Sequence, residues 1–272
     1  MASFPYKKVL LIGATSGIGL ELAEQLVLKG VYVISVGRRQ NRLDSFISAH
    51  GSSKAAGFAF DIAEIDKIPS FAETVIKQHP DIDCIVLNAG VQYVMDFSKP
   101  HTVDIAKIQN EISINYVAIV ALTHAFVPFF QANSMDKEVA FIYTTTSLMS
   151  VPYPMVPNYS SSKAALHAFI LCIREQFKQK PESKINVVEL VVPLVQTELH
   201  DGQPGWSQDF NPGMPVKQFV SESIAGFETK EETVAIGQAK QVFDEFELEK
   251  GRRVGPVWEI IKKNMGKAHT FG

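Results

Sequence analysis

The sequence predicts one α/β domain, residues 1–272, in which a doubly wound parallel sheet of six or seven strands carries helices on both faces. The first observation behind this fold class is an alternation of short aliphatic, β-branched runs with segments whose apolar residues recur at helical spacing. The second is size and composition. With 272 residues, 46% of them hydrophobic and 20% charged, the chain has enough apolar material for one large core.

Four predicted strands with their intervening helices occupy the N-terminal third of the chain. The strands span 9–12, 31–36, 57–60 and 82–87. A helix at 18–28 follows the first strand, with apolar residues at Ile18, Leu22 and Leu26; another begins near Arg39, and a third ends near His79. Strands separated by helices of this length are joined by right-handed crossovers, so the sheet should be parallel and buried on both faces.

Two long helices and two further strands are predicted next. They are a helix at about 104–130, a strand at 138–144, a helix at about 157–178 and a strand at 185–192. After Thr197 the pattern weakens, because 201–215 is rich in glycine, proline and aromatic residues, and we expect a flexible substrate-binding lid at 198–230. Helix-like segments follow around 221–224 and 231–246, without a clear seventh strand.

Charge and composition argue against several function classes. The formal net charge is -3 and the pI about 6.2, without the basic surface typical of nucleic-acid binding. The N-terminal residues lack the apolar core and cleavage site of a signal peptide, and no uninterrupted apolar run approaches the ~20 residues that span a bilayer. No cluster has metal-ligand spacing. We therefore expect a cytoplasmic protein with no nucleic-acid partner, no membrane partner and no metal.

A glycine-rich turn follows the first predicted strand and opens the first predicted helix. It reads Gly13-Ala14-Thr15-Ser16-Gly17-Ile18-Gly19. Glycines let the backbone turn tightly and approach phosphates, while the helix N-terminus offers free N–H groups and a partial positive charge. Alone, such glycines would be ordinary turn residues. Between a strand and a helix they are typical of the Rossmann fold and predict a pyrophosphate site.

The residues that follow the next two strands indicate which dinucleotide is bound. An NAD site has an acidic residue after the second strand, but this chain has Gly37, Arg38 and Arg39. Because a guanidinium pairs with a 2′-phosphate, we predict NADP (NADPH) as the cofactor. The alternative is that both arginines are solvated charges at a helix start. Asp61, after the third strand, either hydrogen-bonds the adenine amino group or caps the next helix.

Tyr159 and Lys163 are the candidate catalytic pair. They are separated by four positions at the start of a predicted helix, so their side chains lie on one face, one turn apart. An ammonium beside a phenol stabilises the phenolate and brings the tyrosine pKa toward neutrality, where proton transfer is efficient. The pair alone would be commonplace on a helix surface.

Together these motifs resemble the short-chain dehydrogenase/reductase family. The glycine turn, Asp61-Ile62, Asn88-Ala89-Gly90, Asn115, and Tyr159 with Lys163 occur in the family's order and approximate spacing, within about residues 1–200. The stretch 88–92 and Tyr153-Pro154 are similar to a branch of the family that includes bacterial DltE-like proteins.

The resemblance implies a role for each matching residue. Tyr159 would donate the proton to a substrate carbonyl oxygen or remove it from an alcohol, and Lys163 would hold the nicotinamide ribose and lower the tyrosine pKa. Asn115 would anchor a water that links Lys163 to solvent. The remaining cofactor contacts would be Asn88 with Ala89 and Gly90 beside the fourth strand, and Asp61 with Ile62 at the adenine.

Two departures from the family pattern lie close to the expected active site. The family has a serine about 13 residues before the tyrosine, where this chain has Thr146 followed by Ser147. Either hydroxyl would orient the substrate oxygen, and we slightly prefer Ser147 because threonine is more restricted at its first torsion. After the sixth strand the family has Pro-Gly, where this chain has Pro193-Leu194. Val195 and Thr197 would therefore have to reach the carboxamide group of the nicotinamide without the turn that this glycine allows.

The expected pocket borders are rich in large apolar groups. Candidate substrate contacts are Tyr93, Met149, Tyr153, Met155 and Trp206. They suggest a hydrophobic ketone, aldehyde or secondary alcohol as substrate. Family members commonly pair their two long helices, and the small residues at 164, 165 and 168 would permit this, so we expect a homodimer or a homotetramer. The alternative functions are an NADP-binding sensor or scaffold without redox turnover, and a non-redox cyclase or isomerase.

Overall fold

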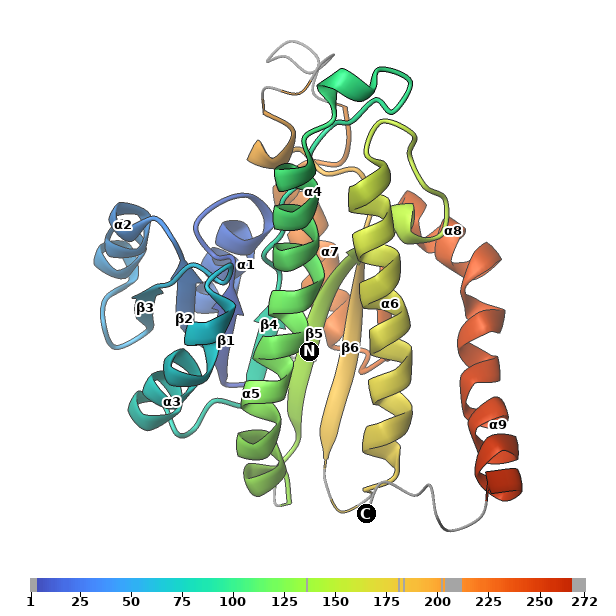
Figure 1. Ribbon diagram of the computed structural model, residues 1–272. Helices are drawn as coiled ribbons and strands as arrows, with labels where there is room; N and C mark the ends of the chain where they lie inside the picture. Colours follow the sequence, from blue (N-terminus) through green and yellow to red (C-terminus); the bar gives the residue numbers. More distant parts are fainter. Residues whose placement is uncertain are drawn as a thin grey trace.

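Seven parallel strands form one sheet in the order β3-β2-β1-β4-β5-β6-β7 (Figure 1). The computed structural model describes residues 4–135, 137–180, 182, 184–201, 203 and 212–265. The strands are β1 (Lys8–Ile12), β2 (Tyr32–Gly37), β3 (Ala55–Ala59), β4 (Cys84–Leu87), β5 (Val139–Thr146), β6 (Ile185–Val192) and β7 (Thr233–Ala235). The order in which successive strands are added reverses between β1 and β4, and at such a point open α/β sheets bind ligands beyond the carboxyl ends of the strands.

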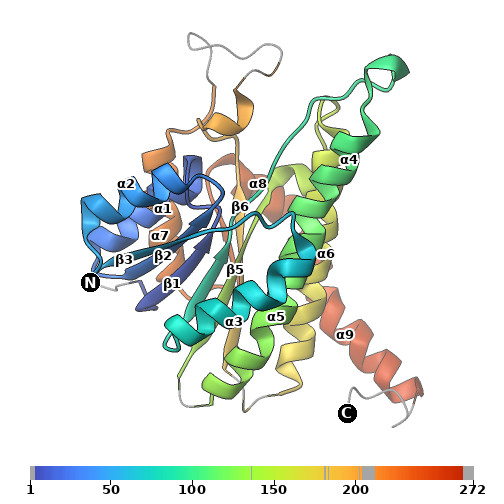
Figure 2. The ribbon, with the colours of Figure 1, turned by 60° about the vertical axis from the view of Figure 1, so that its left-hand side comes forward.

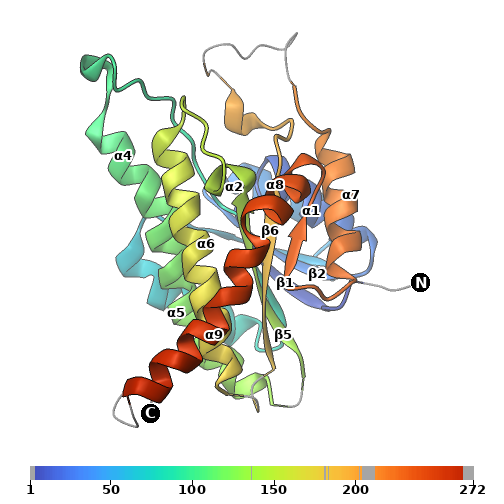
Figure 3. The same cartoon turned by 90° about the vertical axis from the view of Figure 1, so that its right-hand side faces the viewer.

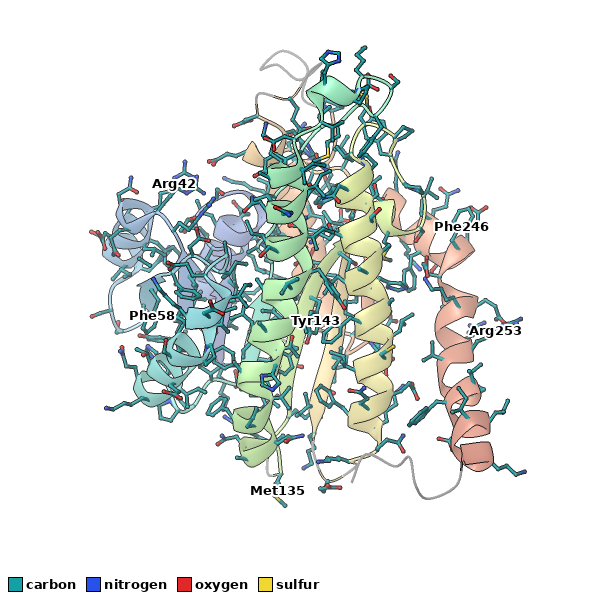
Figure 4. The ribbon with its side chains drawn as sticks, viewed as in Figure 1. Arg42, Phe58, Met135, Tyr143, Phe246 and Arg253 are labelled. Atoms are coloured by element: carbon teal, nitrogen blue, oxygen red, sulfur yellow. The ribbon has the colours of Figure 1, made fainter. Side chains whose placement is uncertain are left out.

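Helices cover both faces of the sheet, as the sequence predicts (Figure 2). On one face lie α1 (Gly17–Leu28), α2 (Gln40–His50) and α7 (Val216–Phe227); on the other lie α3 (Ile68–Gln78), α5 (Ala118–Asn133) and α6 (Pro157–Lys178). Every residue of β5 is buried, because its alternate side chains enter two cores. Ile142 packs toward α1 and α7, whereas Tyr143 lies behind α5 and α6 (Figure 4).

The predicted helix at 104–130 is composite. Helix α4 (Ile105–Ile112) is capped by Asp104, whose carboxylate accepts from Ala106 N at 2.9 Å, and a π-helical turn, Ser113–Val117, joins it to α5. Such a turn inserts one extra residue into the helix and is frequent at functional sites. It contains Asn115.

The same helical run, Ile105–Asn133, is long and apolar enough to cross a membrane by length and composition. The sequence reading had expected no such segment. Only 39% of its most apolar window, with mean hydropathy 1.7, is buried inside the fold. Because a helix that covers a sheet meets the same criterion, the absence of a membrane partner stays a prediction. Val117 and Ile105 are among the exposed apolar residues of this run.

The structure differs from the sequence prediction around residues 231–246. Residues 231–246 were expected to be helical, but β7 pairs in parallel with β6 at this place, and helix α8 (Gln238–Phe246) begins only afterwards. A three-residue edge strand is too short to show an alternating pattern, so the helical spacing of α8 masked it. Helix α9 (Leu248–Met265) then runs beside α6 (Figure 3).

The predicted lid at 198–230 includes residues that belong to the core. Helix α7 buries Phe219, Val220 and Ile224 against α1 and the sheet. Met214 N donates to Leu194 O at 2.9 Å, and Gln196 N donates to Met214 O at 3.0 Å, so the chain returns to the end of β6 before α7 begins. The part of the predicted lid from Gly213 onward therefore belongs to the folded domain, and residues 202 and 204–211 of it lie outside the described residues.

Candidate active site

A cleft of about 1060 Å³ opens at the carboxyl ends of β1, β2, β4, β5 and β6. It brings together most of the site residues that the sequence predicts. Those lining it are Gly13, Thr15, Ser16, Gly17, Ile18, Arg38, Arg39, Asp61, Ile62, Asn88, Ala89, Gly90, Tyr93, Thr146, Ser147, Tyr153, Tyr159, Lys163, Val195 and Thr197. Gly19, Asn115, Met149 and Met155 do not line the cleft, and Trp206 lies outside the described residues.

The glycine turn forms a surface that only glycines allow. Gly13 has φ +87°, and a Cβ there would lie 2.7 Å from the backbone of Ala89. A Cβ on Gly19 would lie 2.0 Å from Gly13 O. The turn is held by Val36 O, which accepts from Gly13 N at 2.9 Å, and α1 begins at Gly17, which has φ +53°. The close backbone approach and the open helix N-terminus fit a dinucleotide pyrophosphate.

Asn88 connects the end of β4 to this turn. Its backbone N donates to Ile12 O at 3.1 Å, and its side-chain Nδ2 donates to Gly13 O at 3.2 Å. Thr144 Oγ1 lies 3.4 Å from Asn88 Oδ1 and completes the link to β5. The residue therefore braces three adjacent strand ends beside the cleft.

The arginines after β2 occupy two different positions. Arg38 is 64% exposed, and its Nη1 lies 3.7 Å from Asp61 Oδ2. Arg39 points back to the glycine turn, where its guanidinium donates to the hydroxyls of Thr15 and Ser16. Arg39 is thus oriented by the glycine turn, whereas Arg38 lies farther out.

A third arginine, Arg42, also contacts the glycine turn, and the sequence analysis does not identify it. Its Nη1 donates to Thr15 O at 2.9 Å, and Arg42 lies on α2 at the upper left of the molecule (Figure 4). Arg42 could have been identified from its spacing of three from Arg39, which places both side chains on the same side of the first turn of α2. Glu198 Oε2 lies 3.1 Å from Arg39 Nη1, and Glu198 Oε1 lies 2.8 Å from Arg42 Nη1.

Asp61 both lines the cleft and shapes the chain that follows it. Its Oδ1 accepts from Ala63 N at 3.0 Å, which is the capping role, while Oδ2 faces Arg38. Asp61 could therefore cap the following segment through Oδ1 and still contact an adenine in the cleft.

Tyr159 and Lys163 lie on the first turns of α6, with Lys163 Nζ 5.8 Å from the centre of the Tyr159 ring. Both are buried, at 8% and 3% exposure. Lys163 Nζ donates to Thr144 O at 2.8 Å, so the ammonium is fixed at the end of β5. The geometry gives a phenol and an ammonium on one wall of the cleft.

Burial governs the ionisation of both groups. It lowers the pKa of Lys163 to about 8, because an ammonium loses hydration there. Burial, and then the negative charge of Glu111, raise the pKa of Tyr159 above its ordinary value. From the spacing alone, the ammonium of Lys163 is expected to lower the pKa of Tyr159. In the structure desolvation dominates, and Lys163 Nζ is directed at Thr144 O.

Asn115 fixes the loop after β4. Its Oδ1 accepts from Val91 N at 2.9 Å, while Nδ2 donates to Val91 O at 2.9 Å and to Ser162 Oγ at 3.1 Å. Both amide donors are therefore used inside the protein. The expected water at this place would have to be held by another group or by the second lone pair of Oδ1.

Glu111, near the end of α4 and two residues before the π-helical turn, is a buried charged residue that the sequence analysis does not single out. It is fully buried, and its Oε1 accepts from Tyr93 N at 3.0 Å while Oε2 accepts from Asn158 Nδ2 at 2.6 Å. Burial raises the pKa of Glu111, against the lowering effect of those two hydrogen bonds. Its spacing of three from both Ile108 and Ile114, which places it on the same helix face as they are, was the available indication. Glu111 positions the loop that carries Tyr93 and the start of α6.

Thr146 and Ser147 both remain candidates for orienting the substrate. Thr146 ends β5, and its Oγ1 lies 3.4 Å from Leu148 N, where it caps the short 3-10 helix Ser147–Met149. Ser147 lines the cleft, and within the described residues no hydrogen bond engages its hydroxyl. The Ser147 hydroxyl is therefore more available than that of Thr146 to hydrogen-bond a substrate.

The proposed substrate contacts divide into two groups. Tyr93 and Tyr153 line the cleft, whereas Met149 is buried beside Val191 and Ala239, and Met155 lies 39% exposed outside it. Polar groups that the sequence reading did not single out also line the cleft. They are Gln92, His200, Gln203 and Gln238; Gln203 Nε2 donates to Gln92 Oε1 at 3.1 Å.

Comparison with known proteins places this site in a family. An "Uncharacterized oxidoreductase DltE" of Bacillus subtilis is 32% identical over 195 residues, 71% of this chain and 73% of that protein. A benzil reductase of Saccharomyces cerevisiae, which forms (S)-benzoin, is 26% identical over 71% of this chain and 73% of its own length.

Solved structures show the same fold at lower identity. A serine dehydrogenase complexed with NADP+ superposes with a TM-score of 0.74 at 22% identity, covering 84% of this chain and 94% of that one. A short-chain dehydrogenase from Sphingobium yanoikuyae in complex with NADPH has a TM-score of 0.74 at 20% identity, covering 97% and 98%. The short chain dehydrogenase family matches residues 7–207, which contain the glycine turn, Asn115, Tyr159 and Lys163, and the chain belongs to this family of oxidoreductases.

Proposed function

We propose that the protein is an NADPH-dependent reductase of hydrophobic ketones or aldehydes, able to oxidise secondary alcohols in reverse. The observation that carries this proposal is the meeting of the buried Tyr159–Lys163 pair and the glycine turn in one cleft. A dinucleotide that follows the turn would have its other end beside these two side chains. A nicotinamide placed there supplies the hydride.

The protein's own groups handle the proton. Because burial and Glu111 raise its pKa, the Tyr159 phenol is protonated at neutral pH and suits a donor to the carbonyl oxygen in reduction. The Lys163 ammonium, fixed 2.8 Å from Thr144 O, lies where it would stabilise the phenolate left behind. A hydroxyl from Ser147 or Thr146 would hold the carbonyl oxygen in position.

The preference for NADPH is assigned to the arginines beside the glycine turn. Replacing Arg39 with alanine should weaken NADPH binding by about tenfold and leave NADH binding within about twofold, because only NADPH carries the 2′-phosphate. Arg38→Ala is the matched control and should have the smaller effect, since Arg38 is more exposed and turned toward Asp61. Fluorescence titration of both cofactors measures this. Equal losses for NADPH and NADH in Arg39→Ala would contradict the assignment.

The substrate class follows from the lining of the cleft near Tyr159. Tyr93, Leu148, Tyr153, Leu194 and Val242 form an apolar border, and the Gln92–Gln203 pair adds a polar edge. An aromatic or branched carbonyl compound with one further hydrogen-bonding group fits this mixture. The similarity to a benzil reductase supports an aromatic ketone.

The direct test is oxidation of NADPH in the presence of aromatic and aliphatic carbonyl compounds, measured for the wild type and for Tyr159→Phe. Turnover that requires Tyr159 and prefers NADPH supports the proposal. NADPH binding without turnover of any carbonyl compound would favour a cofactor-binding protein without redox activity.

We also propose a homodimer, or a tetramer of such dimers, formed through the outer face of α5 and α6. This face is incompletely buried: Ala168 on α6 is exposed, and Val117, in the π-helical turn that leads into α5, is 41% exposed. Replacing Ala168 with arginine should convert the dimer to a monomer in sedimentation velocity, because a buried unpaired charge opposes close helix approach. Leu28→Arg, at a side chain 80% exposed on α1, is the control. A wild-type protein that stays monomeric at micromolar concentration would contradict the proposal.

A further inference from the structure

Glu198 occupies the position that an anion would take beside Arg39 and Arg42. It follows β6 on the short 3-10 helix Glu198–His200, far in sequence from the two arginines, which are the N-cap and a first-turn residue of α2. One carboxylate oxygen faces each guanidinium, at 3.1 and 2.8 Å. A single carboxylate thus bridges two arginines next to the glycine turn.

The same arginine groups are the ones that would hold a phosphate. Arg39 and Arg42 are both anchored on Thr15, through its hydroxyl and its backbone oxygen. Their orientation therefore does not depend on Glu198 alone. Two forked guanidinium groups aimed at one point match the oxygens of a phosphate as well as those of a carboxylate.

Glu198 is held in reach of this point by its own neighbours. A Cβ built on Gly17 would lie 3.2 Å from Thr197 Cβ, so Thr197 sits against the glycine turn. The Thr197 hydroxyl also caps the turn that carries Glu198, with Leu199 N 3.4 Å from its oxygen. Hydrogen bonds from Arg42 and Arg39 hold the pKa of Glu198 below its ordinary value despite partial burial. The carboxylate is therefore charged at neutral pH.

We propose that Glu198 competes with the 2′-phosphate of NADP(H) for Arg39 and Arg42, and so sets how tightly this chain binds the phosphorylated dinucleotide. The inference rests on the proposed NADP site. A 2′-phosphate carries close to two negative charges at neutral pH and displaces a single carboxylate. All three side chains are partly exposed, at 40%, 38% and 46% for Arg39, Arg42 and Glu198, so the exchange needs no opening of the core. Displacement frees the turn Glu198–His200.

The test uses small ligands that report on the phosphate alone. Adenosine 2′-monophosphate and adenosine 5′-monophosphate are titrated by calorimetry into the wild type and Glu198→Gln. Removing the competing charge should tighten 2′-monophosphate binding by roughly three- to tenfold, as expected for two partly exposed ion pairs. Binding of the 5′-monophosphate should stay within about twofold, because it presents no phosphate at this position.

Two further variants separate competition from a general change in charge. Asp201→Asn removes a negative charge from the same segment without touching the arginines, and should leave both affinities unchanged. Glu198→Asp keeps the charge but shortens the side chain, so it cannot bridge both guanidinium groups. It should give part of the gain seen with Glu198→Gln.

Hydrogen exchange of a peptide that covers Thr197–Asp201 gives an independent readout. In the wild type, adenosine 2′-monophosphate should raise its exchange; in Glu198→Gln, exchange should be high with or without the ligand. Unchanged or weaker 2′-monophosphate binding in Glu198→Gln, with normal binding by the wild type, would overturn this inference alone. Failure of the wild type to bind the 2′-monophosphate at all would overturn the NADP site as well.

Discussion

Replacing Tyr159 with phenylalanine is expected to lower kcat for carbonyl reduction by about 10²- to 10⁴-fold, the range typical of losing a general acid. The change removes only the hydroxyl, and the ring continues to fill its buried position on α6. NADPH affinity should stay within about twofold, because the proposed cofactor contacts come mainly from the glycine turn and the arginines. Steady-state kinetics and fluorescence titration measure the two quantities separately.

Tyr153→Phe provides the matched control. Tyr153 also lines the cleft but is 53% exposed and lies before α6 begins, so loss of its hydroxyl should change KM more than kcat. If Tyr159→Phe retained wild-type kcat, the proton would have to come from another group. Ser147 and the polar residues at the cleft edge would then be the next candidates.

The second large effect concerns pH and Lys163. Because burial lowers its pKa to about 8, Lys163 is an ammonium below that pH and loses its proton as the pH rises through it. We expect kcat/KM for reduction to be full below about pH 8 and to fall up to tenfold per pH unit above it, since the neutral amine no longer stabilises the phenolate. Measuring kcat/KM at a series of pH values between 6 and 10 would show this decline.

Two substitutions of Lys163 test whether this residue causes the decline of kcat/KM above pH 8. Lys163→Met should lower kcat/KM by about 10²-fold or more at every pH, because no charge remains beside Tyr159. Lys163→Arg keeps its charge far above pH 8, so its remaining activity should show no decline near that pH. If kcat/KM of Lys163→Arg still declined above pH 8, the decline would have to come from the titration of a different group. The stability of each variant is followed by thermal unfolding.

The fold was predictable because the signals in the first two thirds of the chain are local and repeated. Helix α6 begins and ends at the predicted residues, Pro157 and Lys178, since a proline opens it and a long apolar stripe sustains it. The seventh strand was not predictable. Its stability comes from pairing with β6 and not from a pattern of its own.

The placement of Tyr159 and Lys163 on one face of α6 was predictable because it depends on spacing within one helix. The missed residues depend on contacts between distant segments. Glu198 meets Arg42 only because β6 and β2 end at the same edge of the sheet, and Glu111 meets Asn158 only because α4 packs on α6. The ionisation of Tyr159 was mispredicted for a related reason: spacing shows that Lys163 is near, but not how completely both groups are buried.

The π-helical turn Ser113–Val117 has a consequence for which length changes this chain can accept. A wide turn of this kind takes up one residue more than an α-helical turn with little added rotation, so the faces of α4 and α5 keep their relation to each other. Deleting one residue from α4 or from the start of α5 would instead rotate part of the run by roughly 100°, the angle per residue of an α-helix, and Glu111 would turn away from Asn158 and Tyr93. Related chains should therefore differ by one residue within the wide turn more readily than in the regular helix on either side of it.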